Sequence, residues 1–208
     1  MSTQKKQIIS GWEILLIIIF FLLFSYLTKS NIDTLKSFMG QSYGSMFIFF
    51  CVTAMAVIIA PINSEPLIPL ASNIWGWQIA GLLTLLGWTL GSLVAFVIAR
   101  RYGISLLKKW VPIKKINELE KFIPHEHVFW SIVFLRMTIP ADLFSYVLGL
   151  FSEISTKKYL LATFIGLVPF SFALAYVGEL PLFYQLMALS TGLLVILLGI
   201  LIALAKKK

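Results

Sequence analysis

The sequence predicts an all-α integral membrane protein with about four full transmembrane helices plus two opposed re-entrant helical hairpins arranged as an inverted repeat. Composition is the first of three observations behind this prediction. Of 208 residues, 59% are hydrophobic and only 12% are charged, and the mean hydropathy is +0.92. Soluble domains average about 45–50% apolar and about 25% charged residues. Because this chain has too few polar side chains to cover a surface in water, we expect it to lie in a lipid bilayer.

The lengths of the apolar runs are the second observation. A full crossing takes about 20 apolar residues, with a range of roughly 17–25. Lys5 and Lys6 precede the first run as in a signal peptide, but no small-residue cleavage site follows, so we expect this run to remain as an anchor. The four runs that qualify as crossings are residues 12–27, 77–99, 159–177 and 182–205.

A fifth apolar region is too short for a comfortable crossing. Residues 46–60 stop at Pro61, a polar turn that contains Glu65 follows, and a second apolar stretch covers residues 67–75. Proline removes a backbone donor and disfavours helix at the preceding residue. Two apolar halves around a polar, proline-containing centre predict a re-entrant hairpin, because irregular backbone survives at that depth only when buried in protein or lining a wet cavity.

A sixth apolar region has the same design at greater length. Residues 128–151 are long enough to cross the bilayer, but Arg136, Pro140 and Asp142 lie in the middle. We therefore predict a second re-entrant hairpin here, with a single full crossing as the alternative.

The distribution of basic residues is the third observation, and it separates these alternatives. If both hairpins return to the side that they entered from, fourteen of the 17 Lys and Arg residues face the cytoplasm with both chain termini. Full crossings would move the basic cluster of residues 100–121 to the opposite side, and most of the asymmetry would vanish. The positive-inside rule therefore favours two hairpins that open on opposite sides.

Each predicted hairpin is followed by a spanning helix with small or helix-breaking residues. Gly87 and Gly91 fit the small-xxx-small pattern of close helix packing. Two hairpin-plus-helix units in opposite orientation predict an inverted repeat with a transport site near the midplane, the alternative being ordinary irregularity. The predicted helix-packing positions are Gly87, Gly91, Gly149, Gly166 and Pro169.

The chain therefore divides into three predicted parts. Residues 1–45 form an anchor helix and an interfacial helix, residues 46–180 form the core, and residues 182–208 form a last transmembrane helix with a basic tail. Within the core we predict a hairpin at 46–76, a span at 77–99, a cytoplasmic basic segment at 100–127, a hairpin at 128–151 and a span at 159–177.

Three charged side chains are predicted to lie inside the bilayer, namely Glu65, Arg136 and Asp142. Each costs about 2.5–3.5 kcal/mol on insertion scales, and such residues usually pair and usually function. Arg136 offers a planar, permanently charged donor suited to a phosphate, and half-helices that start after Pro66 and Pro140 would favour an anion. Asp142 and Glu65 are proton-coupling candidates, because a low dielectric favours the neutral acid. The alternative is an Arg136–Asp142 clamp that only fixes the hairpin.

No enzyme site competes with this interpretation. The chain has no Gly-rich phosphate loop and no nucleophile with a nearby base, and a lipid phosphatase or transferase could use only His125 and His127 at headgroup level. Histidines at i and i+2 do not share a helix face, so interfacial packing is favoured over a metal site. The single Cys51 excludes an internal disulfide. We therefore expect no enzymatic activity, no metal and no cofactor. We also expect no nucleic-acid partner, because the residues behind the net charge of +8 lie between apolar runs and not on one soluble face.

The second hairpin also carries a family resemblance. Residues 136–150 read RMTIPADLFSYVLGL, and residues 163–169 continue with TFIGLVP. In the first half, NIWG at 73–76 and RRYG at 100–103 accompany the glycine pair of the 77–99 span. Over roughly residues 46–180 the chain resembles the DedA-like, VTT-domain superfamily of SNARE-associated Golgi proteins, and most of all its Tvp-type branch.

The resemblance implies two opposed re-entrant loops and membership among lipid scramblases and flippases, some of which are thought to move undecaprenyl phosphate or phospholipids with proton coupling. It implies headgroup binding by the motif residues Arg136, Pro140, Asp142 and Tyr146. Glu65 lies where the first hairpin of the family often has an acidic residue. The stricter DedA pattern has a second arginine after the proline, which residues 141–143 lack, and a second carboxylate after the first proline turn, which residues 67–70 lack. These departures weaken the expectation of proton coupling more than that of membership.

We therefore predict a transporter that moves an anionic phospholipid or polyprenyl phosphate between leaflets, with membrane lipids as partners and a prokaryotic plasma membrane as its location. A homo-oligomer is left open. One alternative is a non-transporting membrane organiser that uses its basic segment, so that neutralising Lys108, Lys109, Lys114 and Lys115 would abolish its activity. A proton-coupled carrier of small solutes ranks last, because few polar residues are available to line a wet cavity.

Overall fold

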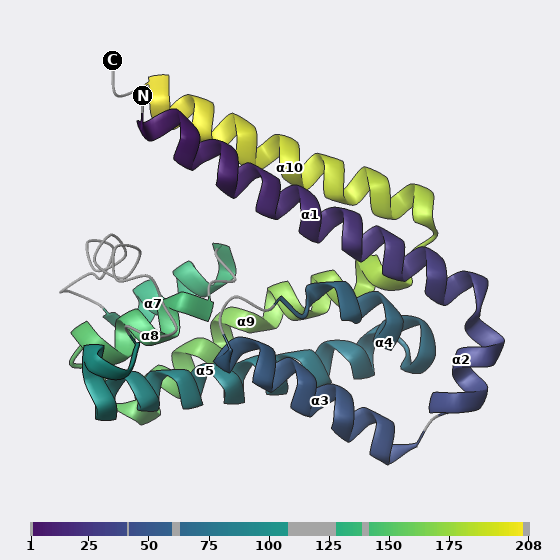
Figure 1. Cartoon of the computed structure of the whole chain (residues 1–208), viewed down its shortest axis with the longest axis horizontal. Helices are drawn as coiled ribbons and strands as arrows, with labels where there is room; N and C mark the ends of the chain where they lie inside the picture. Colours follow the sequence, from purple (N-terminus) through teal and green to yellow (C-terminus); the bar gives the residue numbers. More distant parts are fainter. Residues whose placement is uncertain (1, 41, 60–62, 108–127, 139–141, 206–208) are drawn as a thin grey trace.

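The computed structural model describes residues 2–40, 42–59, 63–107, 128–138 and 142–205, with only the backbone described at some helix ends. All regular structure in this part of the chain is helical, as predicted (Figure 1). The helices are α1 (Ser2–Ser30), α2 (Ile32–Met39), α3 (Tyr43–Ile58), the 3₁₀ turn η1 (Glu65–Leu67), α4 (Ile68–Trp75), α5 (Trp77–Leu107), α7 (Val128–Thr138), α8 (Asp142–Phe151), α9 (Thr156–Glu179) and α10 (Leu182–Ala205).

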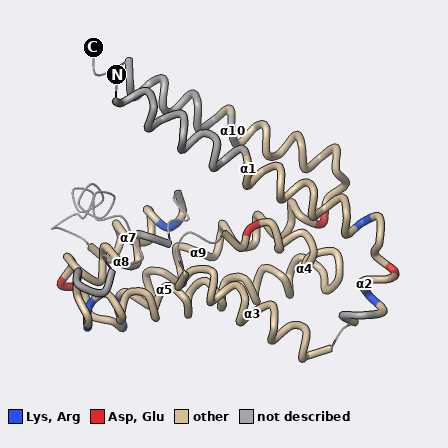
Figure 2. The backbone as a smooth tube through the Cα atoms, in the orientation of Figure 1, with Lys and Arg blue, Asp and Glu red and all other residues tan. Residues whose placement is uncertain are grey.

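Two helices are long and apolar enough to cross a membrane within the described residues, Trp77–Gly103 of α5 and Thr156–Glu179 of α9. They match the two predicted spans of the core. The outer helices α1 and α10 are 29 and 24 residues long, but only part of their side chains is described. Among the residues that Figure 2 colours by charge, few of those between the ends of the helices are Lys, Arg, Asp or Glu. The chain is an integral membrane protein on this combination of length, composition and charge.

Local chemistry fixes where several helices begin and end. The Ser42 hydroxyl accepts a hydrogen bond from the Gly44 amide at the start of α3, and the Ser155 hydroxyl caps α9 in the same way. Pro66 occupies the first turn of η1, where its missing N–H costs nothing. Gly76 has φ +83°, a conformation that L side chains rarely adopt, and it lets the chain turn from α4 directly into α5.

The two long helices α5 and α9 run antiparallel at the centre of the molecule. Trp77 at the start of α5 contacts Tyr176 near the end of α9, while Phe96 near the end of α5 stacks on Tyr159 near the start of α9. The shorter helices pack around this pair in a crossed pattern. α3 lies on α5 and α7 on α9, whereas α8 lies on α5 and α4 lies against both α9 and α5.

Glycines let these helices approach closely. Gly87 and Gly91 of α5 face α3, where an added Cβ at Gly91 would lie 2.8 Å from Val57 Cβ. Gly149 of α8 lies against the Phe96 carbonyl of α5, and Gly166 of α9 lies against α7. Pro169 lies inside α9, one turn beyond Gly166. A side chain at Gly91, Gly149 or Gly166 would force neighbouring backbone apart, and one at Gly87 would collide with the side chain of Thr53.

Helices α1 and α10 lie side by side and extend away from the rest of the molecule (Figure 1). They are joined to the core where α9 ends. The buried Gln185 amide donates to Ser25 Oγ at 2.7 Å, to the Gly178 carbonyl at 2.9 Å and to the Leu180 carbonyl at 2.8 Å. Lys29 Nζ also donates to the Leu180 carbonyl. These bonds anchor the pair at one end, because they satisfy carbonyls that the end of α9 leaves open.

Candidate functional site

Arg136 is the centre of the candidate site. It lies in the last turn of α7, and its side chain is only 2% exposed. Its Nη2 donates to Ser145 Oγ of α8 at 2.6 Å and to the Tyr159 hydroxyl of α9 at 2.8 Å. We call α7 and α8 the second broken segment, and α3, η1 and α4 the first. The guanidinium therefore joins both halves of the second broken segment to α9, one of the two central helices.

Tyr159 extends this network to the other central helix. Its hydroxyl accepts from Arg136 and donates to the Ser92 carbonyl of α5 at 3.2 Å. Its ring stacks on Phe96, with centroids 3.9 Å apart and an angle of 8° between the planes. The stack fixes the ring, so the hydroxyl is held where α5, α7, α8 and α9 meet.

Close packing between α7 and α9 buries the arginine. A Cβ added to Gly166 of α9 would lie 2.6 Å from the Cβ of Arg136 and 2.7 Å from the Val133 carbonyl. Tyr146 of α8 is buried, and its hydroxyl donates to the Ile58 carbonyl at the end of α3. The second broken segment thus contacts the first one next to the arginine site.

Glu65 begins η1 at the turn of the first broken segment. Its Oε2 is buried and has no hydrogen-bond partner among the residues that the structure describes. The adjacent Ser64 is fixed more firmly, since its hydroxyl accepts from Trp88 Nε1 of α5 at 2.9 Å, and Trp88 stacks on Phe170 of α9. This turn is therefore bound to both central helices, as the second segment is through Tyr159.

Several predicted site residues fall where the structure gives no side chain. Pro140, His125 and His127 lie outside the described residues, and only the backbone of Asp142 is described, as the first residue of α8. Residues 108–127, the larger part of the predicted basic segment, lie outside as well. Among the described side chains, no group of three or more His, Cys, Asp or Glu residues could hold a metal ion.

Sequence reasoning did not identify Ser145 and Tyr159 as partners of Arg136. Ser145 lies inside the resembling motif but is small and common in helices. Tyr159 lies 23 residues from Arg136 at the start of a predicted span, where aromatic residues are expected anyway at the membrane interface. No local pattern marks either residue, because their role depends on how α7, α8 and α9 pack.

A buried arginine in a broken helical segment, packed on a pair of long apolar helices, defines an integral membrane protein with a polar site inside its helical core. The profile of the VTT domain matches residues 61–180, which is more than half of the chain. The protein belongs to the VTT-domain family, the DedA and SNARE-associated Golgi proteins. VTT-domain proteins are not generally enzymes. No curated protein and no solved structure matches the chain.

Proposed function

We propose that the protein moves a lipid with a phosphate-containing, anionic headgroup between the leaflets, and that the headgroup passes Arg136. The observation that supports this is the burial of a permanently charged side chain at the junction of both central helices and the second broken segment. Charges at such depth are costly and mark substrate pathways, and a guanidinium can hold a phosphate through two parallel hydrogen bonds. Pro140, Asp142 and Tyr146 belong to the same proposed site through the family motif.

The proposal requires broken segments that enter and leave on one side of the bilayer. The first segment supports this, because Trp75 Nε1 at the end of α4 donates to the Gly40 carbonyl just before α3, at 3.0 Å. The chain thus returns close to where it started. α3 and α4 are 16 and 8 residues long, too short for comfortable crossings.

Corresponding contacts in the two halves support an inverted repeat. Gly87 lies ten residues after the start of α5 at Trp77, and Gly166 lies ten residues after the start of α9 at Thr156. Gly87 packs against α3 and Gly166 packs against α7, which are the first short helices of the two halves.

The far ends of the central helices correspond in the same way. Arg100 lies 23 residues into α5 and donates to the Ile154 carbonyl, in the turn before α9, at 2.6 Å. Glu179 lies 23 residues into α9 and accepts from the Trp77 amide, at the turn before α5, at 3.0 Å. Each central helix therefore holds the turn that leads into the other, as two halves related by inversion would.

In this structure Arg136 is enclosed, so a headgroup could reach it only when α7 or α8 moves away from α9. Opening would free the guanidinium from the hydroxyls of Ser145 and Tyr159, so that phosphate oxygens could accept its hydrogen bonds in their place. Glu65 and Asp142 are the proposed proton-coupling residues. For Glu65 the support is its buried Oε2, which has no hydrogen-bond partner in the described part of the chain.

The test is lipid movement in vesicles that contain the purified full chain and a fluorescent anionic phospholipid. We expect wild type to move the probe faster than empty vesicles do, and Arg136→Ala to lower that rate at least about tenfold, the effect of ~1.4 kcal/mol. The control is Arg101→Ala, which removes an exposed arginine near the end of α5. Equal rates for wild type and Arg136→Ala would refute the proposed site, while loss of activity only after neutralising Lys108, Lys109, Lys114 and Lys115 would favour a membrane organiser.

A further inference from the structure

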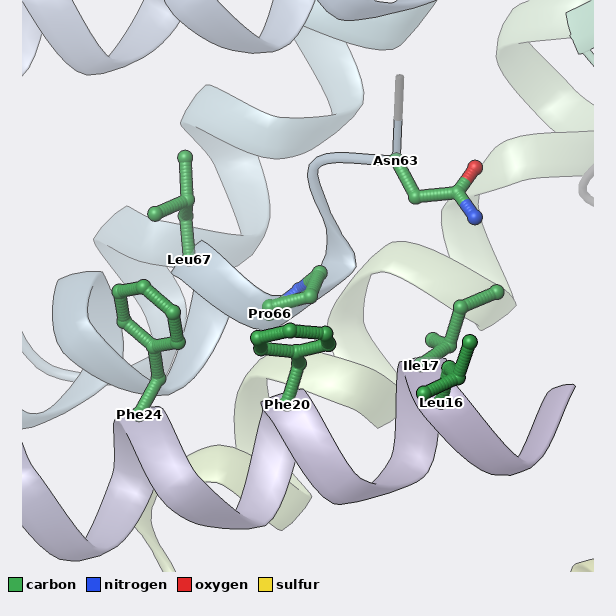
Figure 3. Close-up of a pocket in the computed structure, with 7 residues that line it drawn as sticks. All are labelled: Leu16, Ile17, Phe20, Phe24, Asn63, Pro66 and Leu67. Carbon is green, nitrogen blue, oxygen red and sulfur yellow. The ribbon is translucent and has the colours of Figure 1, made fainter. Parts of the chain in front are cut away.

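An apolar groove lies between α1 and the turn of the first broken segment. Its volume is about 430 Å³. In Figure 3 the ring of Phe20 lies beneath Pro66, and Phe24 lies beneath Leu67. The Asn63 side chain points away from Pro66 and Leu67 and lies above Leu16 and Ile17. The residues that line it are Leu16, Ile17, Phe20, Phe24, Asn63, Pro66 and Leu67.

A second apolar groove, of about 280 Å³, lies on the α3 side of the same turn. Asn63 and Leu67 line both grooves, so the two grooves meet at this turn. The second groove is lined by Cys51, Val52, Met55 and Ala56 of α3 and by Ile59, which follows that helix.

Both grooves open onto surfaces that lipid is expected to cover. Leu16 and Phe20 of the first groove are each 47% exposed, and Met55 of the second is 50% exposed. In a bilayer the molecules available to fill such apolar grooves are acyl chains. The polar member common to both is Asn63, whose exposed amide offers two donors and an acceptor.

This arrangement matches the shape of a diacyl glycerophospholipid. Such a lipid branches into two apolar chains at a glycerol unit that carries two ester carbonyls. The grooves supply two apolar channels that meet at one amide. A polyprenyl phosphate has a single chain and could fill only one of them.

The second groove also leads to the candidate headgroup site. Ile59 lines the groove, and the preceding Ile58 accepts the hydrogen bond from the Tyr146 hydroxyl. Tyr146 follows Ser145, which binds Arg136. Two hydrogen bonds and two pairs of sequence neighbours therefore connect the groove to the buried arginine.

We propose that the two grooves hold the two acyl chains of one diacyl phospholipid, which straddles the turn of residues 63–67 with its glycerol esters at Asn63. This inference rests on the proposed function for the fate of the headgroup, and it selects a two-chain phospholipid over a single-chain polyprenyl phosphate as the substrate class.

Photocrosslinking tests this binding separately from transport. The full chain is placed in vesicles that contain phosphatidylglycerol with a diazirine in each of its two acyl chains, and labelled peptides are mapped by mass spectrometry. We expect label in both residues 16–24 and residues 51–59. A tryptophan at Leu16 or Met55 should lower the label in its own groove about tenfold, the effect of ~1.4 kcal/mol of lost binding.

Matched controls use the same helices and the same substitution. Leu23→Trp in α1 and Ile48→Trp in α3 change exposed apolar residues that line neither groove, and we expect label as in wild type. A polyprenyl phosphate with the same diazirine should label one groove or neither.

Two outcomes would overturn the inference. One is label spread evenly over the exposed apolar faces of α1 and α3, and the other is no effect of Leu16→Trp and Met55→Trp. If both grooves are labelled but no lipid moves in the vesicle assay, the proposed function fails while the two-chain site stands.

Discussion

Arg136 brings a permanent charge into a position where its side chain is only 2% exposed. Two neutral hydroxyls, on Ser145 and Tyr159, accept from the same nitrogen. Hydrogen bonds to a charged group each contribute about 1.5–3 kcal/mol, more than those between neutral groups. The hydroxyls therefore hold the guanidinium in place but could exchange for phosphate oxygens, which are stronger acceptors.

Tyr159→Phe should lower the free energy of unfolding by about 1–3 kcal/mol, because it removes the acceptor for Arg136 and the donor to the Ser92 carbonyl while keeping the stack on Phe96. Denaturant unfolding of the purified protein in detergent measures this. Tyr176→Phe is the control on the same helix, since that ring is half exposed, and we expect a change within about 0.5 kcal/mol. Equal stability of Tyr159→Phe and wild type would contradict the assigned network.

At the scale of elements, the separation between α7 and α9 depends on one missing side chain. Gly166 lets the backbone of α7 approach until its Val133 carbonyl is 2.7 Å from where a Cβ would lie. Small residues at such contacts allow helices in a membrane to gain close van der Waals packing.

Gly166→Ala should therefore lower the free energy of unfolding by about 1–3 kcal/mol, despite the better helix propensity of alanine. Gly192→Ala in α10 is the control, because nothing lies within 4 Å of an added Cβ there. We expect that control to be neutral or slightly stabilising in the same unfolding measurement. If Gly166→Ala is as stable as Gly192→Ala, the two helices are not held at the described separation.

Apolar run length and proline position were sufficient to predict most helices. α3 ends before Pro61 and α7 ends before Pro140, two residues that lie outside the described part of the chain, and the spans at 77–99 and 159–177 correspond to α5 and α9. The crossed packing of α4 on α9 and α8 on α5 was not predicted. It depends on contacts between segments far apart in the sequence, such as the bond of 2.9 Å from the Asn73 amide to the Gly178 carbonyl, which no local pattern encodes.

At the scale of the whole molecule, the turns that connect the helices form two hydrogen-bonded groups, one at each end of the pair of central helices. Gly40, Trp75 and Trp77 lie with Glu179 at one end. Arg100 lies with Ile154 at the other end. Because α5 separates Trp77 from Arg100, the proposed topology assigns the first group to the outer face and the second to the cytoplasm.

Single cysteines test this topology in a Cys51→Ala background, which removes the one native thiol. Gly44→Cys and Gln78→Cys flank the first broken segment, Glu153→Cys follows the second, and all three positions are exposed. An impermeant maleimide added to intact cells should label positions 44 and 78 alike, and position 153 only after permeabilisation. Labelling of positions 44 and 78 from opposite sides would mean that the first segment crosses the bilayer fully.

The candidate site was only half predictable from the sequence. Arg136 stands out because a charge inside an apolar run is rare, and Glu65 stands out for the same reason. The residues that hold the arginine, and the two grooves that share Asn63, arise from the packing of distant helices. Asn63 is an ordinary polar residue of a turn until α1 and α3 lie on either side of it.

The most direct test of the central claim compares Arg136→Ala with Tyr159→Phe in the same vesicles, with lipid movement and unfolding measured on each. If Arg136 binds the headgroup, Arg136→Ala lowers the rate at least about tenfold, whereas Tyr159→Phe keeps most of the rate despite its lower stability. If the arginine only clamps the fold, the two variants will lose lipid movement in proportion to their loss of stability, and that result would contradict the account.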